Sequence, residues 1–369
     1  INSVLTIMFL FLIANLGYQM ALIIYDSMLP FIAEKHHIGK ASGFGIAIGY
    51  FGSIIGILLS FLLIPIYGDF AIEPGNTLSE VGVFTLGYIP YIYPLAAIMF
   101  LLFSLPLFLF VKEHEREIPK REFGIRKEVI SQVKVTAGEI RKYKSMFWFL
   151  IGWLIFVDAA NTVIAFMTDI VQVGLEFGES KIALIVLFLG VIFAVLGTYP
   201  IGMYVDRKGP RKGLLLVTLL WTSAILVAFF TNLQIGESRT PEFMVYLVGM
   251  LSGPAIGGTW VVQRQYVIEL APIQKIGNYF GFTNIFGRVS AAVGPLIWAT
   301  SVYIFGLLNF NSNMSTRISI LILGIIMIFG FYIIYSKVED VHDHFLNGAR
   351  ANGKGEWIDE DGNVVFKSN

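Results

Sequence analysis

The chain is long, strongly apolar and electrically neutral. Its 369 residues are 56% hydrophobic and only 14% charged, and the formal net charge at pH 7 is zero. Because a soluble domain carries about 25% charged residues, this composition excludes an ordinary soluble protein. The balanced charge indicates no nucleic-acid partner. The chain has no cysteine, which excludes disulfides and thiolate metal sites.

The apolar residues are gathered into runs that are long enough to cross a lipid bilayer. A transmembrane helix needs about 20 such residues, and its backbone polar groups are satisfied within the helix. We therefore predict an all-α polytopic membrane protein in contact with lipid. Nine helical spans are expected, at residues 2–33, 40–67, 88–111, 145–173, 179–205, 213–233, 242–269, 276–305 and 315–337.

The loops between these spans alternate in charge. Basic residues dominate at 35–40, in the long connection 112–144 and at 206–212, whereas 68–87 is acidic, and the tail begins at Lys337. Loops rich in Lys and Arg stay in the cytoplasm. We therefore expect a cytoplasmic C-terminus, and nine spans then place the first residue on the opposite side.

This topology leads us to expect that about three helices precede Ile1, which would make twelve. The four expected parts are the remainder of an N-terminal bundle (1–111), a cytoplasmic basic linker (112–144), a C-terminal six-helix bundle (145–337) and a cytoplasmic tail (338–369). Two halves joined by a central linker are typical of transporters built from repeats. The linker is predicted as either a surface helix or a solvated charged segment.

The segment 202–212 has the most specific residue pattern in the chain. Its glycines, acid and basic residues are Gly202, Asp206, Arg207, Gly209 and Arg211. We expect Gly202 to allow close helix contact and Gly209 a tight turn. We expect Asp206 to face the positive N-terminus of a neighbouring helix. The pattern resembles the G-x-x-x-D-R-x-G-R-R/K signature of major facilitator transporters, found between their second and third and their eighth and ninth helices. A basic turn without special function would explain the charges but not the spacing.

A second pattern, the apolar run 149–157 followed by Asp158 and Thr162, resembles the seventh helix of transporters similar to the fungal vacuolar amino-acid effluxer of autophagy. Residues 25–30 resemble the fourth helix of that family, and 287–296 the eleventh. The resemblance implies a major facilitator fold with helices 4–12 present, and amino-acid efflux. The chain departs from the family pattern at Ala159, at Gln263-Arg264-Gln265 and at Asn278, and these departures bear on the substrate more than on the fold.

Polar residues within the spans are candidates for a translocation pathway, because such groups cost free energy unless they face a cavity or a partner. In the first span Asn15, Gln19 and Asp26 lie on one helical stripe, and Asp158, Thr162 and Asp169 repeat this spacing. The full set of candidates is Asn15, Gln19, Asp26, Asp158, Asn161, Thr162, Arg264, Asn284 and Arg288.

Asp158 is the strongest of these candidates. It could bind a substrate amine or take up a proton; the alternatives are an ion pair with Arg264 or Arg288, or a hydrogen bond between helices. Arg288 lies midway along its span and could hold a substrate carboxylate or an acidic partner. For Arg264, nearer a span end, extension of the side chain to the interface is the alternative.

These features predict a secondary active transporter that moves a small solute by alternating access. The resemblance adds amino-acid efflux and a proton as candidate coupling ion. The alternative is a non-transporting scaffold or sensor on a degenerate transporter fold. No catalytic, cofactor or metal site is predicted, because the five histidines form no cluster. We expect a monomer in the cell membrane, or in the vacuolar membrane if the source is fungal.

Overall fold

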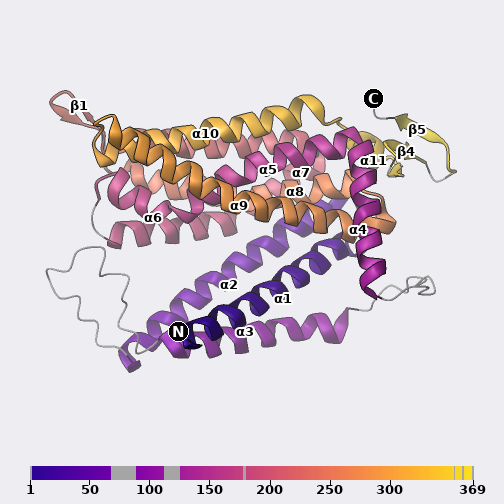
Figure 1. Ribbon diagram of the computed structural model, residues 1–369, viewed down its shortest axis with the longest axis horizontal. Helices are drawn as coiled ribbons and strands as arrows, with labels where there is room; N and C mark the ends of the chain where they lie inside the picture. The colour runs from indigo at the N-terminus through magenta and orange to yellow at the C-terminus, as the bar shows by residue number, and fades with distance from the viewer. Residues whose placement is uncertain are drawn as a thin grey trace. The chain divides into compact units, whose positions relative to one another are not determined.

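A computed structural model of the chain describes residues 2–67, 89–111, 125–177, 180–352, 354–359 and 361–367. The chain divides into two units: a larger one, Ile1–Tyr50 with Arg126–Asn369, and a smaller one, Phe51–Ile125. Figure 1 shows that the described residues of both units are mostly helical. The predicted acidic loop 68–87 and the first part of the basic linker, 112–124, lie outside the described residues.

The described part of the chain has seven helices that are long and apolar enough to cross a membrane. One of the seven is α7, which is two helices joined at a break, and α3 adds a helix of 22 residues. Counting α7 as two spans and adding α3 gives the nine spans that the sequence predicts. The eight long helices are α1 (Asn2–Ile32), α2 (Ile38–Tyr67), α3 (Ile89–Phe110), α5 (Lys144–Ala165), α7 (Ser180–Phe230), α8 (Met244–Leu270), α9 (Ile276–Leu307) and α10 (Ser312–Lys337).

The break in α7 falls at Gly209, whose φ of 83° and ψ of 162° are not helical. It separates a first arm, 180–208, from a second arm, 210–230. Glycine adopts positive φ without the steric penalty that a Cβ atom brings, and Pro210 starts the second arm at a position where its missing N–H costs nothing. The tight turn predicted at Gly209 is confirmed.

One predicted span is interrupted. Residues 145–173 were expected as a continuous helix, but α5 ends at Ala165, and Phe166 has a φ of −100° and a ψ of 14°. A short helix α6 (Met167–Asp169) and a π-helical turn η2 (Ile170–Gly174) follow. The regular α-helix is therefore interrupted at Phe166, between Thr162 and Asp169 of the expected stripe.

The basic linker contains a helix, α4 (Ile125–Lys142), rather than a solvated segment throughout its length. Thr136 and Ile140 are the buried side chains among its residues 131–142. On the same side, Glu139 pairs with Lys275 at 2.5 Å. The remaining short helices among the described residues are η1 (Lys35–His37), η3 (Ile273–Lys275) and α11 (His342–Leu346).

The core of the larger unit lies between α5, α7, α8, α9 and α10. Aromatic rings fill much of it: Trp153 stacks between Phe149 and Phe156, with ring centroids 5.9 and 5.7 Å apart, and Tyr266 contacts Phe149 from α8. Such rings bury large areas and restrict the packing geometry.

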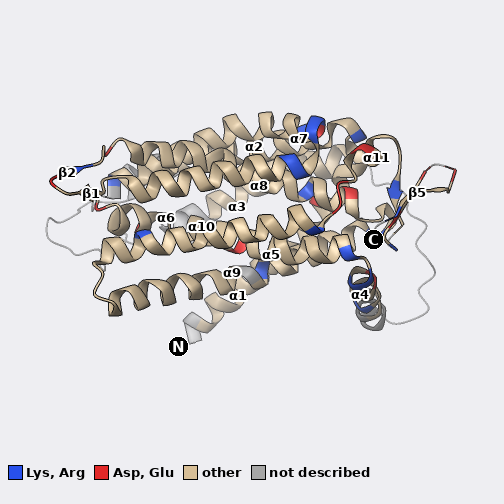
Figure 2. Ribbon diagram, turned by 90° about the horizontal axis from the view of Figure 1, so that it is seen from above, with Lys and Arg blue, Asp and Glu red and all other residues tan. Residues whose placement is uncertain are grey.

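The two ends of the larger unit differ in charge. Figure 2 shows Lys and Arg gathered at the end that holds α4, α11 and β5. We call this the basic end; it also holds the turn before α2 and the break in α7. The opposite end carries a two-stranded hairpin, β1 (Gln234–Ile235) and β2 (Ser238–Arg239), where Arg239 pairs with Glu176 at 3.0 Å.

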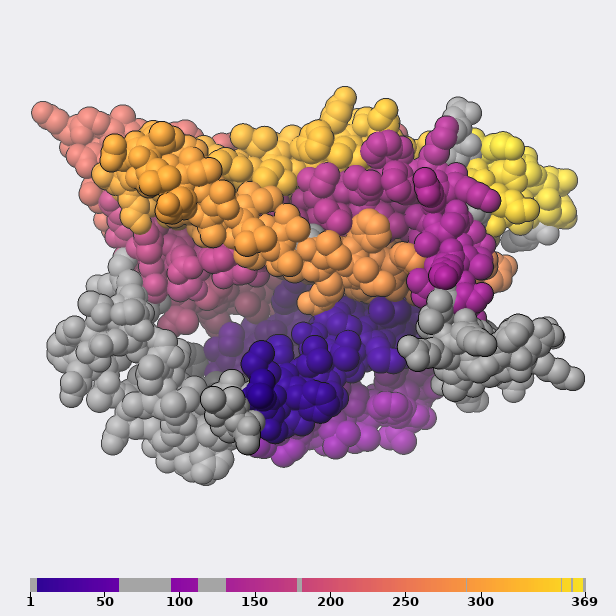
Figure 3. All heavy atoms as spheres, viewed as in Figure 1, coloured from indigo at the N-terminus to yellow at the C-terminus, as the bar shows by residue number. Residues whose placement is uncertain are grey.

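The tail folds against the basic end. Its strands β3 (Arg350–Ala351), β4 (Glu356–Ile358) and β5 (Val364–Lys367) form an antiparallel sheet in that order. Trp357 pairs with Phe366 across β4 and β5 and is completely buried. The dipeptide Asp361–Gly362, which is suited to a tight hairpin turn, lies between β4 and β5, with Gly362 at a φ of 84°. In Figure 3 the tail (yellow) lies against one end of the larger unit.

Candidate functional site

The Asp206 carboxylate binds the N-terminus of α2. Its Oδ1 accepts a hydrogen bond of 2.6 Å from the backbone N–H of Gly39, and its Oδ2 accepts one of 2.9 Å from Lys40. The first N–H groups of a helix lack partners within it, and the helix dipole favours a negative charge there. The Asp206 carboxylate supplies both an acceptor for these N–H groups and a negative charge at the N-terminus of α2. Its place in the sequence pattern led us to expect this contact.

Gly202, one turn before Asp206, lies directly on the backbone of α2. A Cβ atom at this position would come within 2.2 Å of the carbonyl oxygen of Gly39, which no side chain tolerates. The absence of a side chain therefore brings the first arm of α7 close enough for Asp206 to reach the N–H groups. The expected close approach at Gly202 is present.

The basic residues of the signature segment have different surroundings. Arg211 donates from Nη2 to the carbonyl oxygen of Tyr335, and its guanidinium lies 4.3 Å from the centroid of the Tyr335 ring. Tyr335 belongs to the last turn of α10, where cationic side chains compensate the free carbonyl groups. Arg207 is exposed. Arg211 thus fixes the second arm of α7 to α10.

Asp26 and Arg264 form a buried ion pair between α1 and α8. Arg264 Nε lies 2.8 Å from Asp26 Oδ1, and the two residues are 8% and 5% exposed. Arg264 also donates to Ser42 Oγ at 3.3 Å and lies 5.3 Å from the ring of Tyr25. Arg264 therefore does not extend to the interface. The two charges of a buried ion pair have lost most of their hydration, so that removing one partner leaves the other charge uncompensated.

Asp158 on α5 binds the backbone of α9. Its Oδ1 accepts a hydrogen bond of 2.8 Å from the N–H of Gly294, and the Thr162 hydroxyl donates to the Asp158 carbonyl oxygen at 2.8 Å. Of the alternatives that the sequence left open, the structure has the hydrogen bond between helices, whereas Arg264 pairs with Asp26. In the described part of the chain Asp158 forms no ion pair with Arg288.

The other pathway candidates are less enclosed. Gln19 Nε2 donates to the exposed Asn15 at 3.2 Å, while Gln19 Oε1 is buried without a described partner. The Nδ2 atom of Asn284, on α9, is likewise buried without one. Arg288, one turn further along α9, is exposed, and no described residue forms an ion pair with it. Asn161 is half-buried beside Thr162.

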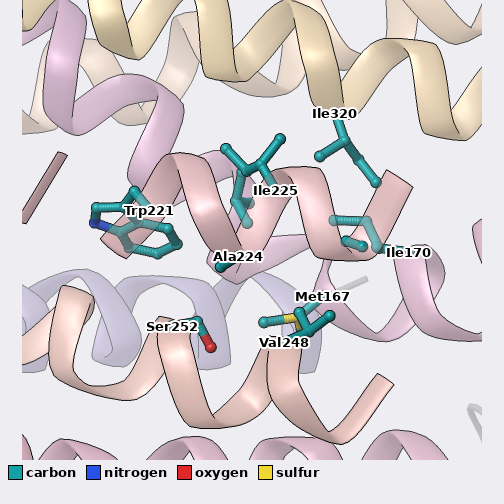
Figure 4. A pocket seen from close by; sticks show the side chains of 10 residues that line it. Met167, Ile170, Trp221, Ala224, Ile225, Val248, Ser252 and Ile320 are labelled. Atoms are coloured by element: carbon teal, nitrogen blue, oxygen red, sulfur yellow. The ribbon is translucent and has the colours of Figure 1, made fainter. Parts of the chain in front are cut away.

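A small apolar cavity lies within the larger unit, away from these polar groups. Figure 4 shows it between α6, η2, the second arm of α7, α8 and α10, with Met167, Trp221 and Ile320 among its walls. Its volume of about 10 Å³ corresponds to about one water molecule. It is therefore a packing defect rather than a solute site.

Several buried polar contacts at the basic end were not predicted from the sequence. Glu269, at the end of α8, is 2% exposed and binds His342 of the tail, with 2.6 Å between Glu269 Oε1 and His342 Nδ1. The indole N–H of Trp357 donates to the Glu269 carbonyl oxygen at 3.2 Å. Two signals in the sequence could have indicated this contact: Glu269 is a lone acid at the end of an apolar span, and the tail contains aromatic residues. The described residues contain no cluster of three or more potential metal ligands.

The long apolar helices, the signature break and the contact of Asp206 with α2 define a polytopic membrane protein of the transporter class. The model of the Major Facilitator Superfamily matches residues 1–295 and 159–357, and the chain belongs to this family.

Individual relatives are distant but cover most of the chain. The chain is 24% identical to an uncharacterized MFS-type transporter, YxiO, of Bacillus subtilis, over 88% of this chain and 70% of the relative. It is also 24% identical to autophagy-related protein 22 of Vanderwaltozyma polyspora, over 78% and 59%. The solved proton:xylose symporter XylE superimposes with a TM-score of 0.53 at 15% identity, over 86% and 67%, and supports the fold.

Proposed function

We propose that the protein is a secondary active transporter that moves a small solute by alternating access. The observation that supports this most directly is the pair of contacts at the basic end. Asp206 binds the N-terminus of α2, and Asp26 pairs with Arg264. Helices α1 and α2, which precede the basic linker in the sequence, are thereby held to α7 and α8, which follow it. This state is closed at the basic end.

Opening this end requires both contacts to break. The hydrogen bonds to Asp206 can be exchanged for water, because they lie at the end of the helices. The buried pair of Asp26 and Arg264 can separate only if each partner is hydrated or neutralised. These contacts therefore favour one conformation over the other without a covalent link, as alternating access requires.

For the solute we propose an amino acid or another small carboxylate. Arg288 is a cation within a membrane-spanning helix and has no acidic partner among the described residues. A guanidinium binds a carboxylate through two parallel hydrogen bonds. The nearby Nδ2 of Asn284 is an additional donor without a described partner. Export of this solute is the direction that the resemblance to autophagy-related proteins favours.

Asp158 is the candidate for the substrate amine or a coupling proton. Its hydrogen bond to Gly294 uses Oδ1, so that Oδ2 can accept a further donor. The contact also lies next to Pro295, which interrupts the hydrogen bonding of α9. A change in the charge of Asp158 would therefore act on α9, the helix that carries Arg288.

By the positive-inside rule we infer that the basic end faces the cytoplasm, together with the C-terminus. The membrane is the cell membrane in this proposal, or the vacuolar membrane in a fungus. No second protein chain is required, and we propose that the monomer transports.

The test is transport by the purified chain in proteoliposomes. We expect uptake of labelled amino acids in exchange for internal unlabelled solute, and more uptake than of xylose. Asp158→Asn and Arg288→Ala should each lower the rate by about tenfold or more, equivalent to about 1.4 kcal/mol. The matched controls are Asp169→Asn, an exposed acid beyond the break in α5, and Lys212→Ala, an exposed cation.

The two halves of the proposal fail in different ways. Unchanged rates in both Asp158→Asn and Arg288→Ala would reject the assigned pathway while leaving transport intact. Saturable binding of a solute without any exchange would instead favour a sensor on a transporter fold. A proton gradient that drives accumulation, abolished by a protonophore, would identify the coupling ion.

A further inference from the structure

The carbonyl oxygen of Asp206 loses its helical partner at the break in α7. In an uninterrupted helix this oxygen would accept the N–H of the fourth residue onward, but that residue is Pro210, which has none. The imidazole of His342 occupies the position instead, with Nε2 3.2 Å from the Asp206 oxygen. The ring packs on Gly209, where a Cβ atom would approach it to 3.0 Å.

The second nitrogen of the same ring also faces an acceptor. Nδ1 lies 2.6 Å from Glu269 Oε1, which in addition accepts a hydrogen bond of 2.8 Å from Gln265. An imidazole donates from both nitrogens only in its protonated, cationic form. The carboxylate of Glu269 stabilises this cation, and both residues are nearly inaccessible to water, at 4% and 2% exposed. The geometry therefore accommodates imidazolium.

His342 belongs to the tail, and the rest of the tail is fixed beside it. Trp357 binds the carbonyl oxygen of Glu269, and its ring lies 5.6 Å from that of Tyr143 at the start of α5. Phe345 and Ala351 are buried in the same core. Glu269 thus receives two donors from the tail, one through its side chain and one through its backbone.

The charges around His342 act in opposite directions. Glu269 on α8 and Asp340, just before α11, favour the cation. The Asp206 carboxylate on α7 is engaged by α2, with Lys40 and His37 nearby. Burial alone lowers the pKa of His342, but the hydrogen bond and charge of Glu269, the Asp206 carbonyl oxygen and Asp340 outweigh it. The pKa of His342 is consequently raised above 6.5.

We propose that the tail, residues 338–367, is a proton-dependent clamp, which docks on the break in α7 and on Glu269 when His342 is protonated and loosens when it is neutral. A histidine whose pKa is raised in the docked state contributes its full stabilisation below the pKa of the free side chain. The contribution disappears as the pH rises through the higher docked value. The clamp is closed at acidic pH and weakens as the pH rises through the docked pKa of His342, which lies above 6.5.

Docking of the tail acts on the same turn that carries Asp206. By holding Gly209 and the Asp206 carbonyl oxygen, the clamp supports the geometry in which the Asp206 carboxylate reaches α2. The clamp acts in the same way whichever solute is moved. It links the proton concentration on the side of the basic end to the state that is closed there.

The test uses the whole chain of 369 residues, which has no cysteine of its own. A single reporter, Ala351→Cys, lies in the buried part of the tail, and Val365→Cys, on the exposed β5, is its control. The rate of maleimide labelling is measured for both in detergent from pH 5.5 to 9. The ratio of the two rates largely removes the intrinsic pH dependence of a thiol.

We expect the ratio to rise several-fold with pH, with a midpoint above 6.5. In His342→Gln the ratio should be independent of pH. Glu269→Gln should shift the midpoint to lower pH, because the cation loses its carboxylate. The matched control is His344→Gln, two residues further along α11, whose ring stacks on Phe366 and whose change should leave the midpoint in place.

A flat ratio in the parent chain, or a transition that persists in His342→Gln, would overturn the proposal. If His342→Gln does not fold, Glu269→Gln decides, since a midpoint that fails to move there is equally incompatible with the clamp. Transport activity does not enter this measurement, so its outcome is separate from that of the transport assay.

Discussion

The carboxylate of Asp206 and the backbone N–H of Gly39 form a hydrogen bond of 2.6 Å although 167 positions separate them in the sequence. This bond connects the signature segment to the start of α2. Because it joins a charged group to a helix terminus, its strength depends on the charge of Asp206 as well as on its shape.

Asp206→Asn keeps the shape and removes the charge. We expect it to destabilise the closed state by about 1 kcal/mol, the usual contribution of a charged cap. Thermal unfolding in detergent should show a lower midpoint, and a cysteine at the buried Ser42 should label faster. Arg207→Gln, the exposed neighbour, is the control and should change neither. An Asp206→Asn protein with parental midpoint and labelling would argue against the cap.

The buried pair of Asp26 and Arg264 predicts strong non-additivity. Asp26→Asn or Arg264→Gln alone leaves an uncompensated polar or charged group and should cost about 3 kcal/mol or more. The double variant should cost less than the sum, because neither charge remains. A double-mutant cycle of unfolding midpoints measures this coupling. Strict additivity would show that the two side chains do not interact.

Gly209→Ala tests two effects at the break in α7. The backbone conformation of Gly209, with φ 83° and ψ 162°, is essentially restricted to glycine and alone costs an L-residue about 1–3 kcal/mol. The new methyl group would also press on His342. Gly236→Ala, in the β1–β2 turn, is a matched control because its φ is 63° and nothing lies within 4 Å of the added atom. Gly209→Ala should lower the unfolding midpoint more than Gly236→Ala. Equal losses would mean that His342 does not pack there.

The orientation in the membrane can be measured directly. We expect a cysteine at Val365 to react with a membrane-impermeant maleimide only when the cytoplasmic side is accessible. A cysteine at Glu237, in the hairpin at the opposite end, should react in intact cells. Each of these two positions serves as the control for the other, because they lie at opposite ends of the larger unit. The reverse pattern would place the basic end outside and reject the inference from loop charge.

Much of the fold was predictable, because hydrophobic runs and turn residues are local signals. The spans, the break at Gly209 and the hairpin at Gly362 follow from length, glycine conformation and turn chemistry. The break at Phe166 could not be foreseen, since no glycine or proline lies there and the apolar run continues past it.

The site was predictable only in its components. Asp26, Arg264 and Asp158 stand out in the sequence as polar residues within apolar spans. The sequence does not indicate which residues they contact, because it does not tell which spans pack against each other. The pairing of His342 with Glu269, 73 positions apart, depends on a carbonyl oxygen that Pro210 leaves free. The charge-bearing residues were therefore visible in the sequence, whereas their pairing required the helix packing.

The break in α7 has a mechanical consequence. A single residue, Gly209, joins two rigid arms with no loop to absorb movement between them. The first arm is tied to α2 through Asp206, and the second to α10 through Arg211. A tilt of either arm must therefore appear as rotation about the backbone bonds of Gly209, which makes this residue the point where a displacement of one part of the bundle is passed on to the other.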